Sequence, residues 1–294
     1  MAAPITPTES YSALAAAIGV SELRFKREDL HPYGSHKGRS IPVMIGHYAA
    51  AGDHRFAITG SGNAALAAAL YVQEWNAGKT TEQLELDIFI GNHISGHKAD
   101  KLKALASDCI RVTLKERPLQ ALTQAMNEGV RSLRQSTDDE ALVGYEQLAA
   151  ELAGEKDVGA VFIGTSSGTT AQALATYFIQ NKLPIQVHIV QTPSCHPLVE
   201  AFETYDGPDE LSVADAIVDR TALRKDALIP VMKKTGGRGW IATNDDIAAA
   251  QDMAAEHADL EISVNSALSV AGAMKAAALG WDFKGKVICM ICGD

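Results

Sequence analysis

The sequence lacks a long apolar run and a basic leader in front of an apolar segment. No stretch approaches the roughly 20 consecutive apolar residues that a membrane-spanning helix needs. Residues 1–11 show no basic region followed by an apolar core, so we expect no secretory signal peptide. Cysteines are few, four in 294 residues, which is too few for a disulfide framework in a chain of this length. We therefore expect a cytoplasmic protein.

Positive charge and aromatic side chains are also scarce. The net charge is -10 and aromatic residues make up 6% of the chain. An acidic protein is repelled by nucleic acid and by anionic membranes, so we expect neither as a partner. A locally positive site for a small anion remains compatible with this charge. The length, with 47% hydrophobic and 21% charged residues, is typical of an α/β protein with one large domain or two.

Apolar strands alternate with helices along the chain. This alternation predicts parallel sheets covered by helices, with ligands at the carboxyl ends of the strands. The polar residues 136–140 indicate a domain edge, and residues 193–222 are expected to be irregular. We expect strands at 23–26, 55–59, 86–90, 109–114, 158–163, 184–191 and 286–292, and helices at 4–20, 41–51, 64–75, 95–106, 119–135, 144–152, 171–181, 228–234, 245–257 and 266–278.

A turn followed by a helix contains the first candidate for chemistry. Pro32 and Gly34 predict a turn, Ser35 is typical of a helix start, and the apolar run 41–51 predicts the helix. Lys37 would then lie in the first helical turn, where the positive end of the helix dipole disfavours an ammonium ion. This is the setting that a Schiff-base lysine needs.

Two strand-to-helix turns predict pockets for anionic groups. The first is Gly60-Ser61-Gly62-Asn63, and the second is the hydroxyl-rich stretch 164–170. Backbone N–H groups, hydroxyls and the helix dipole together favour a phosphate at such a turn. A tight turn with ordinary helix caps is the alternative for the second stretch. Neither a Walker loop nor a Gly-x-Gly-x-x-Gly after a strand is present. A reactive lysine, a glycine-asparagine turn and a phosphate loop, in that order, fit pyridoxal phosphate.

These motifs resemble the fold type II (tryptophan synthase β-like) family of pyridoxal phosphate enzymes over nearly the whole chain. Residues 26–37 are similar to the lysine-x-glutamate and asparagine-proline-x-glycine-serine-x-lysine pattern of threonine synthase and threonine dehydratase. Residues 60–64 are similar to the serine-glycine-asparagine turn of the family, and residues 212–217 to its serine-x-alanine-aspartate-glycine stretch. Residues 284–294 match its closing strand.

The resemblance implies an α/β fold of two three-layer αβα domains with mainly parallel sheets and an active site in the cleft between them. Residues 1–47 and 141–294 would form the large, cofactor-binding domain. Residues 48–140 would form the smaller domain that contains the Ser61-Asn63 turn.

The resemblance also implies a role for each matched residue. Lys37 would form the Schiff base and move the proton at Cα, Asn63 would bind O3′, and Cys292 would face the pyridine nitrogen. A weakly acidic partner leaves that nitrogen largely unprotonated, which favours elimination or replacement at Cβ or Cγ over transamination. The remaining cofactor-binding residues would be His36, Gly164, Thr165, Ser166, Ser167, Gly168 and Thr169, and the substrate carboxylate would be held by Gly60, Ser61 and Ala64.

We therefore expect a pyridoxal 5′-phosphate-dependent lyase of amino acid metabolism, threonine synthase-like or serine/threonine dehydratase-like, that acts on a small amino acid as a homodimer. Departures from the family pattern bear on the substrate more than on the cofactor. Ser166 and Ser167 replace glycines, and residues 263–266 replace a glutamate-proline-serine-x-alanine pattern. A catalytically silent or regulatory cofactor-binding relative is therefore one alternative, and a plain phosphate-ligand binding protein is another.

Cysteine and histidine pairs suggest competing sites, and none is expected to bind a metal. Cys289 and Cys292 are three apart in an apolar strand, where they would point to opposite faces. His93 and His97 have helical ligand spacing but no evident third ligand. Cys195 and His196 are adjacent, and adjacent side chains seldom meet as nucleophile and base.

Overall fold

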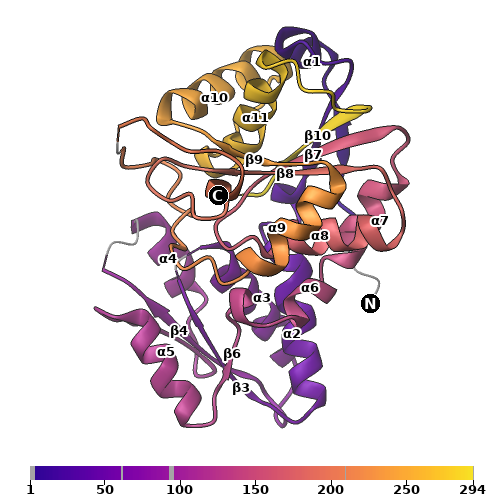
Figure 1. Cartoon of the computed structure of the whole chain (residues 1–294). Helices are drawn as coiled ribbons and strands as arrows, with labels where there is room; N and C mark the ends of the chain where they lie inside the picture. The colour runs from indigo at the N-terminus through magenta and orange to yellow at the C-terminus, as the bar shows by residue number, and fades with distance from the viewer. Residues whose placement is uncertain (1–3, 61, 93–95, 209, 294) are drawn as a thin grey trace. The chain divides into compact units, whose positions relative to one another are not determined.

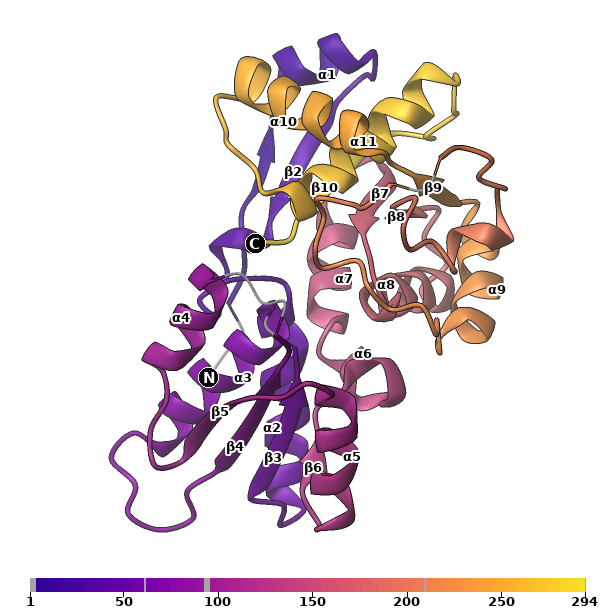
Figure 2. The ribbon, with the colours of Figure 1, turned by 90° about the vertical axis from the view of Figure 1, so that its left-hand side faces the viewer.

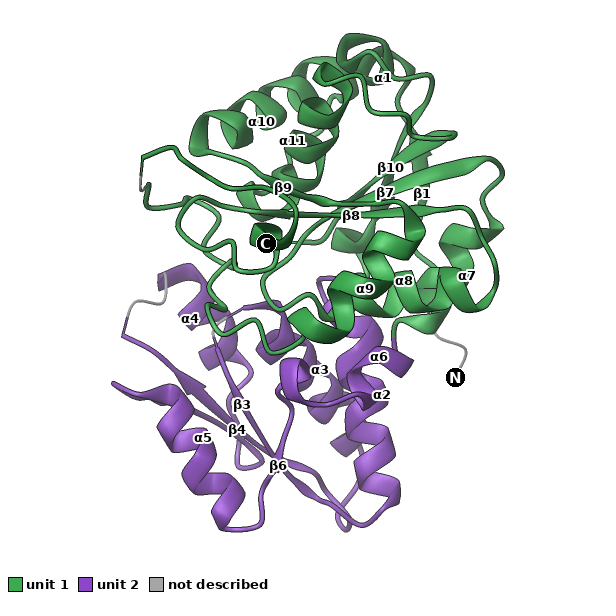
Figure 3. Cartoon of the chain, in the orientation of Figure 1, with its two compact units in different colours: residues 1–31, 145–294 green, residues 32–144 purple. Residues whose placement is uncertain are grey.

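The computed structural model describes residues 4–60, 62–92, 96–208 and 210–293. The chain forms two compact units, shown in Figure 3: unit 1 comprises residues 1–31 and 145–294, and unit 2 comprises residues 32–144. The sequence-based division placed residues 32–47 and 141–144 in the larger domain. In the structure these segments belong to unit 2, because the helix that follows Lys37 packs against other helices of that unit.

Unit 1 is built on a six-stranded sheet with the order β1-β2-β10-β7-β8-β9. All neighbours are parallel except β1, which runs antiparallel to β2 at the edge. The adjacent inner strands β7 and β8 are buried along nearly their whole length, as expected for a parallel sheet covered on both faces. The strands are β1 (Thr8–Ser10), β2 (Leu23–Arg27), β7 (Val158–Gly164), β8 (Gln186–Gln191), β9 (Gly239–Ile241) and β10 (Lys286–Ile291).

Helices cover both faces of this sheet, so unit 1 has three layers. Figure 1 shows α1, α10 and α11 on one face and α7, α8 and α9 on the other. Hydroxyls cap α10 and α11: Thr243 and Asp246 form a reciprocal capping box at the start of α10, and Ser263 caps α11. The helices are α1 (Ser12–Ile18), α7 (Glu146–Gly154), α8 (Thr169–Gln180), α9 (Lys225–Thr235), α10 (Asn244–Ala258) and α11 (Val264–Ala278), with short 3-10 turns η1 (Glu28–Leu30) and η3 (Val199–Ala201).

Unit 2 has a four-stranded parallel sheet with the order β5-β4-β3-β6. Phe56 and Ile58 of β3 pack in the core with α2 and α3, whereas Ala57 between them packs against α5. Because side chains alternate across a strand, these helices cover opposite faces (Figure 2). The elements are α2 (Lys37–Ala50), β3 (Arg55–Thr59), α3 (Asn63–Asn76), β4 (Glu85–Ile90), α4 (Gly96–Ala104), β5 (Ile110–Leu114), α5 (Pro118–Asn127), β6 (Arg131–Ser132), η2 (Gln135–Thr137) and α6 (Glu140–Val143).

Two of the predicted elements need correction, and one strand was missed. The segment 4–20 is not one helix, because Thr8–Ser10 pairs with β2 as a strand before α1 begins. The helix expected at 119–135 ends at Asn127, and the chain then pairs with β3 as β6. The strand β9 was not predicted, since three residues give too little periodicity to detect. None of the helices in the described part of the chain is both long and apolar enough to span a bilayer.

Each sheet contains one point at which the strand order reverses. In unit 1 the chain runs outward through β7, β8 and β9 and returns to place β10 on the other side of β7. In unit 2 it runs outward through β3, β4 and β5 and returns to place β6 beside β3. Ligands of open α/β sheets bind at the carboxyl ends of the strands at such points. The loops that follow β3, β7 and β10 are therefore the candidate binding segments.

Candidate active site

Lys37 is the first residue of α2, as the sequence predicts. The preceding turn is fixed by Gly34, which has a φ of 78°, and by the Ser35 hydroxyl, which accepts the N–H of Lys37 at 3.2 Å. His36 is buried and takes the N-cap position. Lys37 itself is half-buried. Lys37 therefore lies at the start of a 14-residue helix, where the helix dipole is positive.

The glycine-asparagine turn after β3 lies at the start of α3 in the same unit. Gly60 has a φ of 110° and donates its N–H to Phe89 O at 3.1 Å. Asn63 is the first helical residue, and Asn63 and Ala64 are half-buried with their N–H groups at the helix start. Ser61, which was also assigned to the substrate carboxylate, lies outside the described residues.

The turns before α2 and α3 lie close together within unit 2. The two helices pack against each other. A Cβ built on Gly34 would lie 3.2 Å from Leu66 Cδ2, one turn into α3. The fold therefore brings the Lys37 turn close to the Asn63 turn. The sequence alone did not determine that these two turns would be neighbours.

The β7–α8 loop, residues 164–169, is the hydroxyl-rich segment of unit 1. Gly168 is the N-cap of α8 with a φ of 81°, and its N–H is accepted by Thr165 Oγ1 at 3.0 Å. Ser167 Oγ and Thr169 Oγ1 are 2.9 Å apart. Ser166 Oγ accepts the N–H groups of Val218 and Asp219 at 3.0 and 2.9 Å. The loop is thus a set of hydroxyls around the positive end of a 12-residue helix.

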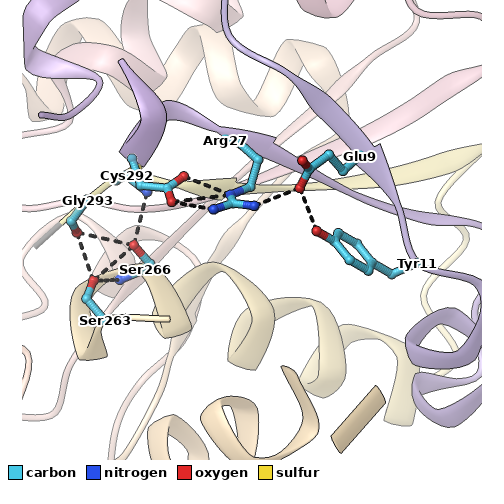
Figure 4. Close-up of polar contacts among 8 residues, drawn as sticks. Glu9, Tyr11, Arg27, Ser263, Ser266, Cys292 and Gly293 are labelled. Atoms are coloured by element: carbon cyan, nitrogen blue, oxygen red, sulfur yellow. Dashed lines mark hydrogen bonds and ion pairs between the residues drawn. The ribbon is translucent and has the colours of Figure 1, made fainter. Parts of the chain in front are cut away.

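Cys292 directly follows β10 and is held by the start of α11. Its N–H is donated to Ser266 Oγ at 3.1 Å, and Ser263 donates its hydroxyl to Gly293 O at 2.8 Å. Figure 4 shows the two serines facing Gly293 and Cys292. The thiol is buried, and Sγ is 3.7 Å from Met290 O. The residues at 263–266, which depart from the family pattern, therefore fix the cysteine that was assigned to the pyridine nitrogen.

Unit 1 brings the β7–α8 loop and Cys292 to the same end of its sheet. β7 and β10 are parallel neighbours, with Ile288 opposite Val161 and Cys289 opposite Phe162. The segments after both strands therefore emerge side by side, at the point of strand reversal. A Cβ on Gly164 would lie 2.9 Å from Leu268 Cβ of α11, so α11 approaches both segments closely.

The donors of unit 1 fit a phosphate-bearing ligand. The loop provides hydroxyls at the positive end of α8 and contains no acidic side chain, so the helix dipole favours an anion there. Cys292 provides a weakly acidic group instead of a carboxylate. In unit 2, Lys37 provides the amine and Asn63 an amide. Cofactor binding through these particular residues remains a proposal.

Two residues of this site were not assigned from the sequence. Ser266 accepts the N–H of Cys292, and Gln191 at the end of β8 bonds the β7–α8 loop. Gln191 is a polar residue at the carboxyl end of a buried parallel strand, and this position is the signal that could have marked it. Ser266 left no such signal, because its partner is 26 residues away in sequence.

The competing cysteine and histidine sites have structural explanations. Burial raises the pKa of the Cys289 thiol, and burial is also the main cause of the raised pKa of the Cys195 thiol. Neither group is therefore an activated thiolate. His196 Nδ1 lies 2.8 Å from Pro193 O, so this ring nitrogen is engaged by backbone. His93 lies outside the described residues. Among the residues whose positions are given, no group of three or more ligand-type side chains could hold a metal ion.

Comparison with known proteins places the chain in a family. Threonine synthase of Mycobacterium leprae (strain TN) is 26% identical over 311 residues, which cover 99% of this chain and 83% of that protein. Threonine synthase of Methanosarcina acetivorans is 24% identical over 310 residues, 98% of this chain and 74% of that protein.

Solved structures with the same fold include enzymes of different reaction types. A pyridoxal 5'-phosphate-dependent aspartate racemase superposes with a TM-score of 0.82 at 18% identity, covering 99% of this chain and 90% of that chain. The processed form of threonine deaminase isoform 2 from Solanum lycopersicum gives a TM-score of 0.80 at 20% identity, covering 99% and 79%. The family model described as "Pyridoxal-phosphate dependent enzyme" matches residues 2–293. With its α/β fold of two mainly parallel sheets, the chain belongs to the pyridoxal-phosphate dependent enzyme family.

Proposed function

We propose that this protein uses pyridoxal 5′-phosphate to catalyse elimination or replacement at Cβ or Cγ of a small amino acid, as a serine/threonine dehydratase or a threonine synthase does. The observation that carries the proposal is the pairing of two adjacent segments in unit 1. The hydroxyl-rich β7–α8 loop and Cys292 follow neighbouring parallel strands. In this proposal the loop supplies donors for the phosphate, and the Cys292 thiol would face the ring nitrogen, where a carboxylate would favour transamination.

The cofactor supplies an aldehyde for the amine and an electron sink for the charge that develops at Cα. Lys37 Nζ would react with this aldehyde and then carry the proton removed from Cα. Lys37 is half-buried at the start of α2, so a helix start fixes the backbone that carries this amine. Asn63 Nδ2 would donate to O3′, and the N–H groups of Asn63 and Ala64 would hold the substrate carboxylate.

Cys292 directs the choice of reaction in this proposal. A thiol, with an ordinary pKa of about 8.5, is neutral at pH 7 and does not stabilise a protonated pyridine nitrogen as an aspartate carboxylate would. The electron sink is then limited, which favours expulsion of a leaving group from the substrate. The likeness to threonine synthases over 99% of the chain supports a hydroxy amino acid or its phosphate ester as substrate. We propose a homodimer in the cytoplasm as the working form.

A catalytically silent cofactor-binding protein is the second candidate. Residues 263–266 differ from the pattern expected in active relatives, and in the structure Ser263 and Ser266 serve to hold the chain at Gly293 and Cys292. Retention of Lys37 favours an active enzyme. The two candidates share the cofactor and differ only in turnover.

Absorption of the purified protein tests cofactor binding. With pyridoxal 5′-phosphate added, we expect a band at about 410 nm that borohydride removes. Lys37→Ala should lack the band, whereas Lys79→Ala, a change at an exposed lysine of the same unit, should keep it. A wild-type protein that stays colourless would contradict the proposal, as would an unchanged band in Lys37→Ala.

A panel of substrates tests turnover. Serine and threonine should give 2-oxo acid and ammonia if the enzyme is a dehydratase, and phosphohomoserine should release inorganic phosphate if it is a synthase. A yellow protein that turns over none of the three and shows no spectral change with any of them would favour the silent relative.

A further inference from the structure

Gln191, the last residue of β8, forms four hydrogen bonds through its side-chain amide. Nε2 donates to Thr165 O and to Ser166 O, both at 3.2 Å. Oε1 accepts the N–H groups of Leu198 and Val199 at 3.0 and 3.2 Å. The side chain is completely buried. The amide therefore links the β7–α8 loop to the turn that follows β8, with all of its bonding capacity in use.

The orientation of this amide is fixed by its partners. A rotation by 180° about the last side-chain bond would set Oε1 against two carbonyl oxygens and Nε2 against two N–H donors. No other residue type reproduces the pattern. A glutamate would present a negative oxygen to the carbonyls of Thr165 and Ser166, and an asparagine is one methylene shorter.

The two carbonyls held by Gln191 determine where the loop N–H groups point. In a trans peptide the C=O and the following N–H point in opposite directions. Because the carbonyls of Thr165 and Ser166 point to Gln191, the N–H groups of Ser166 and Ser167 point away from it. The neighbouring N–H groups have other partners: Thr165 donates to Val190 O at 3.0 Å, and Gly168 donates to Thr165 Oγ1 at 3.0 Å. Ser166 and Ser167 thus offer two N–H donors that point away from Gln191, in the loop that precedes α8.

We infer that Gln191 is a positioning residue that aims the N–H groups of Ser166 and Ser167 at the cofactor phosphate. It touches neither the reacting atoms nor the phosphate, and it acts through the two peptide units that it bonds. The inference rests on the proposed function, because it requires that the β7–α8 loop bind a phosphate. Its consequence is selective: losing the amide should weaken binding of the phosphate and leave binding of the ring unaffected.

Gln186 provides a matched control on the same strand. It is the first residue of β8, is also buried, and donates to Asp282 O at 2.9 Å while accepting from Trp281 Nε1 at 3.0 Å. It lies at the end of β8 that is remote from the β7–α8 loop. Replacing either glutamine by methionine removes the hydrogen bonds of a buried amide from β8 without adding charge.

The experiment compares binding of pyridoxal 5′-phosphate and of pyridoxal, which lacks the phosphate, to wild type, Gln191→Met and Gln186→Met by equilibrium dialysis. In Gln191→Met we expect the ratio of the two affinities to fall about tenfold or more, since misdirected donors of this kind are worth one to two powers of ten in binding. The ³¹P resonance of the bound cofactor should shift as well. Gln186→Met should keep the wild-type ratio and resonance.

The outcomes separate the inference from the proposed function. A wild-type protein that does not prefer pyridoxal 5′-phosphate to pyridoxal would overturn the proposed phosphate site itself. If the wild type shows this preference and Gln191→Met has the same ratio of affinities for pyridoxal 5′-phosphate and pyridoxal, only the role of Gln191 is overturned.

A second measurement tests the positioning role of Gln191 if Gln191→Met does not fold. In the ¹⁵N-labelled unaltered protein, inorganic phosphate should shift the side-chain amide resonances of Gln191 and leave those of Gln186 in place. Equal behaviour of the two glutamines would contradict the positioning role.

Discussion

Ser266 Oγ accepts the backbone N–H of Cys292 at 3.1 Å. This bond joins the first turn of α11 to the residue directly after β10. Ser266 Oγ also lies 3.2 Å from Gly293 O, where Ser263 Oγ forms a second contact at 2.8 Å. The position of the Cys292 thiol is thus set by a helix start that precedes it by 26 residues.

Ser266→Ala should lower the free energy of unfolding by about 1–3 kcal/mol, because it leaves the buried N–H of Cys292 without its acceptor. It should also move the absorption maximum of the bound cofactor, since Cys292 is assigned to the ring nitrogen. Ser263→Ala removes a helix cap and should cost about 1 kcal/mol with a smaller spectral change. Urea unfolding measures the two losses of stability, and absorption spectra measure the shift of the cofactor band. A Ser266→Ala spectrum identical to that of the wild type would refute the assignment of Cys292 to the ring nitrogen.

Gly168→Ala should be more destabilising than Gly19→Ala. Both glycines have similar positive φ angles, 81° and 85°, so both alanines suffer the strain of the left-handed region, about 1 kcal/mol. The surroundings differ: a Cβ on Gly168 would lie 2.6 Å from Leu228 Cδ2, whereas nothing lies within 4 Å of one on Gly19. We expect Gly168→Ala to lose at least another 1 kcal/mol and to bind pyridoxal 5′-phosphate more weakly. Equal unfolding free energies of the two variants in urea would show that the loop accommodates the added methyl group at residue 168 without strain.

Ser166→Ala should release the segment around Asp219, because Ser166 Oγ accepts the N–H groups of Val218 and Asp219. Arg220, the next residue, is exposed and provides a trypsin site. We expect cleavage after Arg220 to become at least several-fold faster, since local opening costs less when two hydrogen bonds are absent. Ser167→Ala leaves both bonds in place and is the control. Mass spectrometry of timed digests identifies the cleavage site. Equal cleavage rates in the two variants would show that the hydrogen bonds to Ser166 Oγ do not hold this segment in place.

His188 should make stability fall in mild acid. It is completely buried, and Trp240 Nε1 donates to its Nδ1 at 3.1 Å. Burial, with a smaller contribution from Arg238, lowers the pKa of His188 to about 3. The histidine of the unfolded chain has a pKa near 6.5. Between this pH and about pH 3, His188 is therefore protonated in the unfolded chain and neutral in the folded protein. Between pH 7 and pH 5 this linkage should cost about 2 kcal/mol of unfolding free energy.

His188→Asn should flatten this pH dependence, because asparagine does not titrate. His54→Asn, a change at an exposed histidine, should leave the pH dependence as in wild type. Urea unfolding at pH 7, 6 and 5 measures the slopes. A wild-type slope retained in His188→Asn would assign the acid sensitivity to other groups.

Local sequence determined the segments with strong periodicity and distinctive turn residues. The strand at 55–59 and the helix starts near Lys37, Asn63 and Thr169 follow from apolar runs broken by glycine and hydroxyl residues. The short elements did not follow. Thr8–Ser10 and Arg131–Ser132 are strands only because β2 and β3 offer them free edges to pair with, and edge pairing leaves almost no trace in a few residues.

The sequence by itself determined the order of the candidate groups along the chain, and with it the resemblance to the pyridoxal phosphate enzymes. Tertiary structure decided which groups meet and what holds them. The neighbours β7 and β10 lie more than 120 residues apart in sequence, yet their pairing sets Cys292 beside the β7–α8 loop. Gln191 and Ser266 gained their roles in the same way, because a hydrogen bond depends on distance and direction in space and not on separation along the chain.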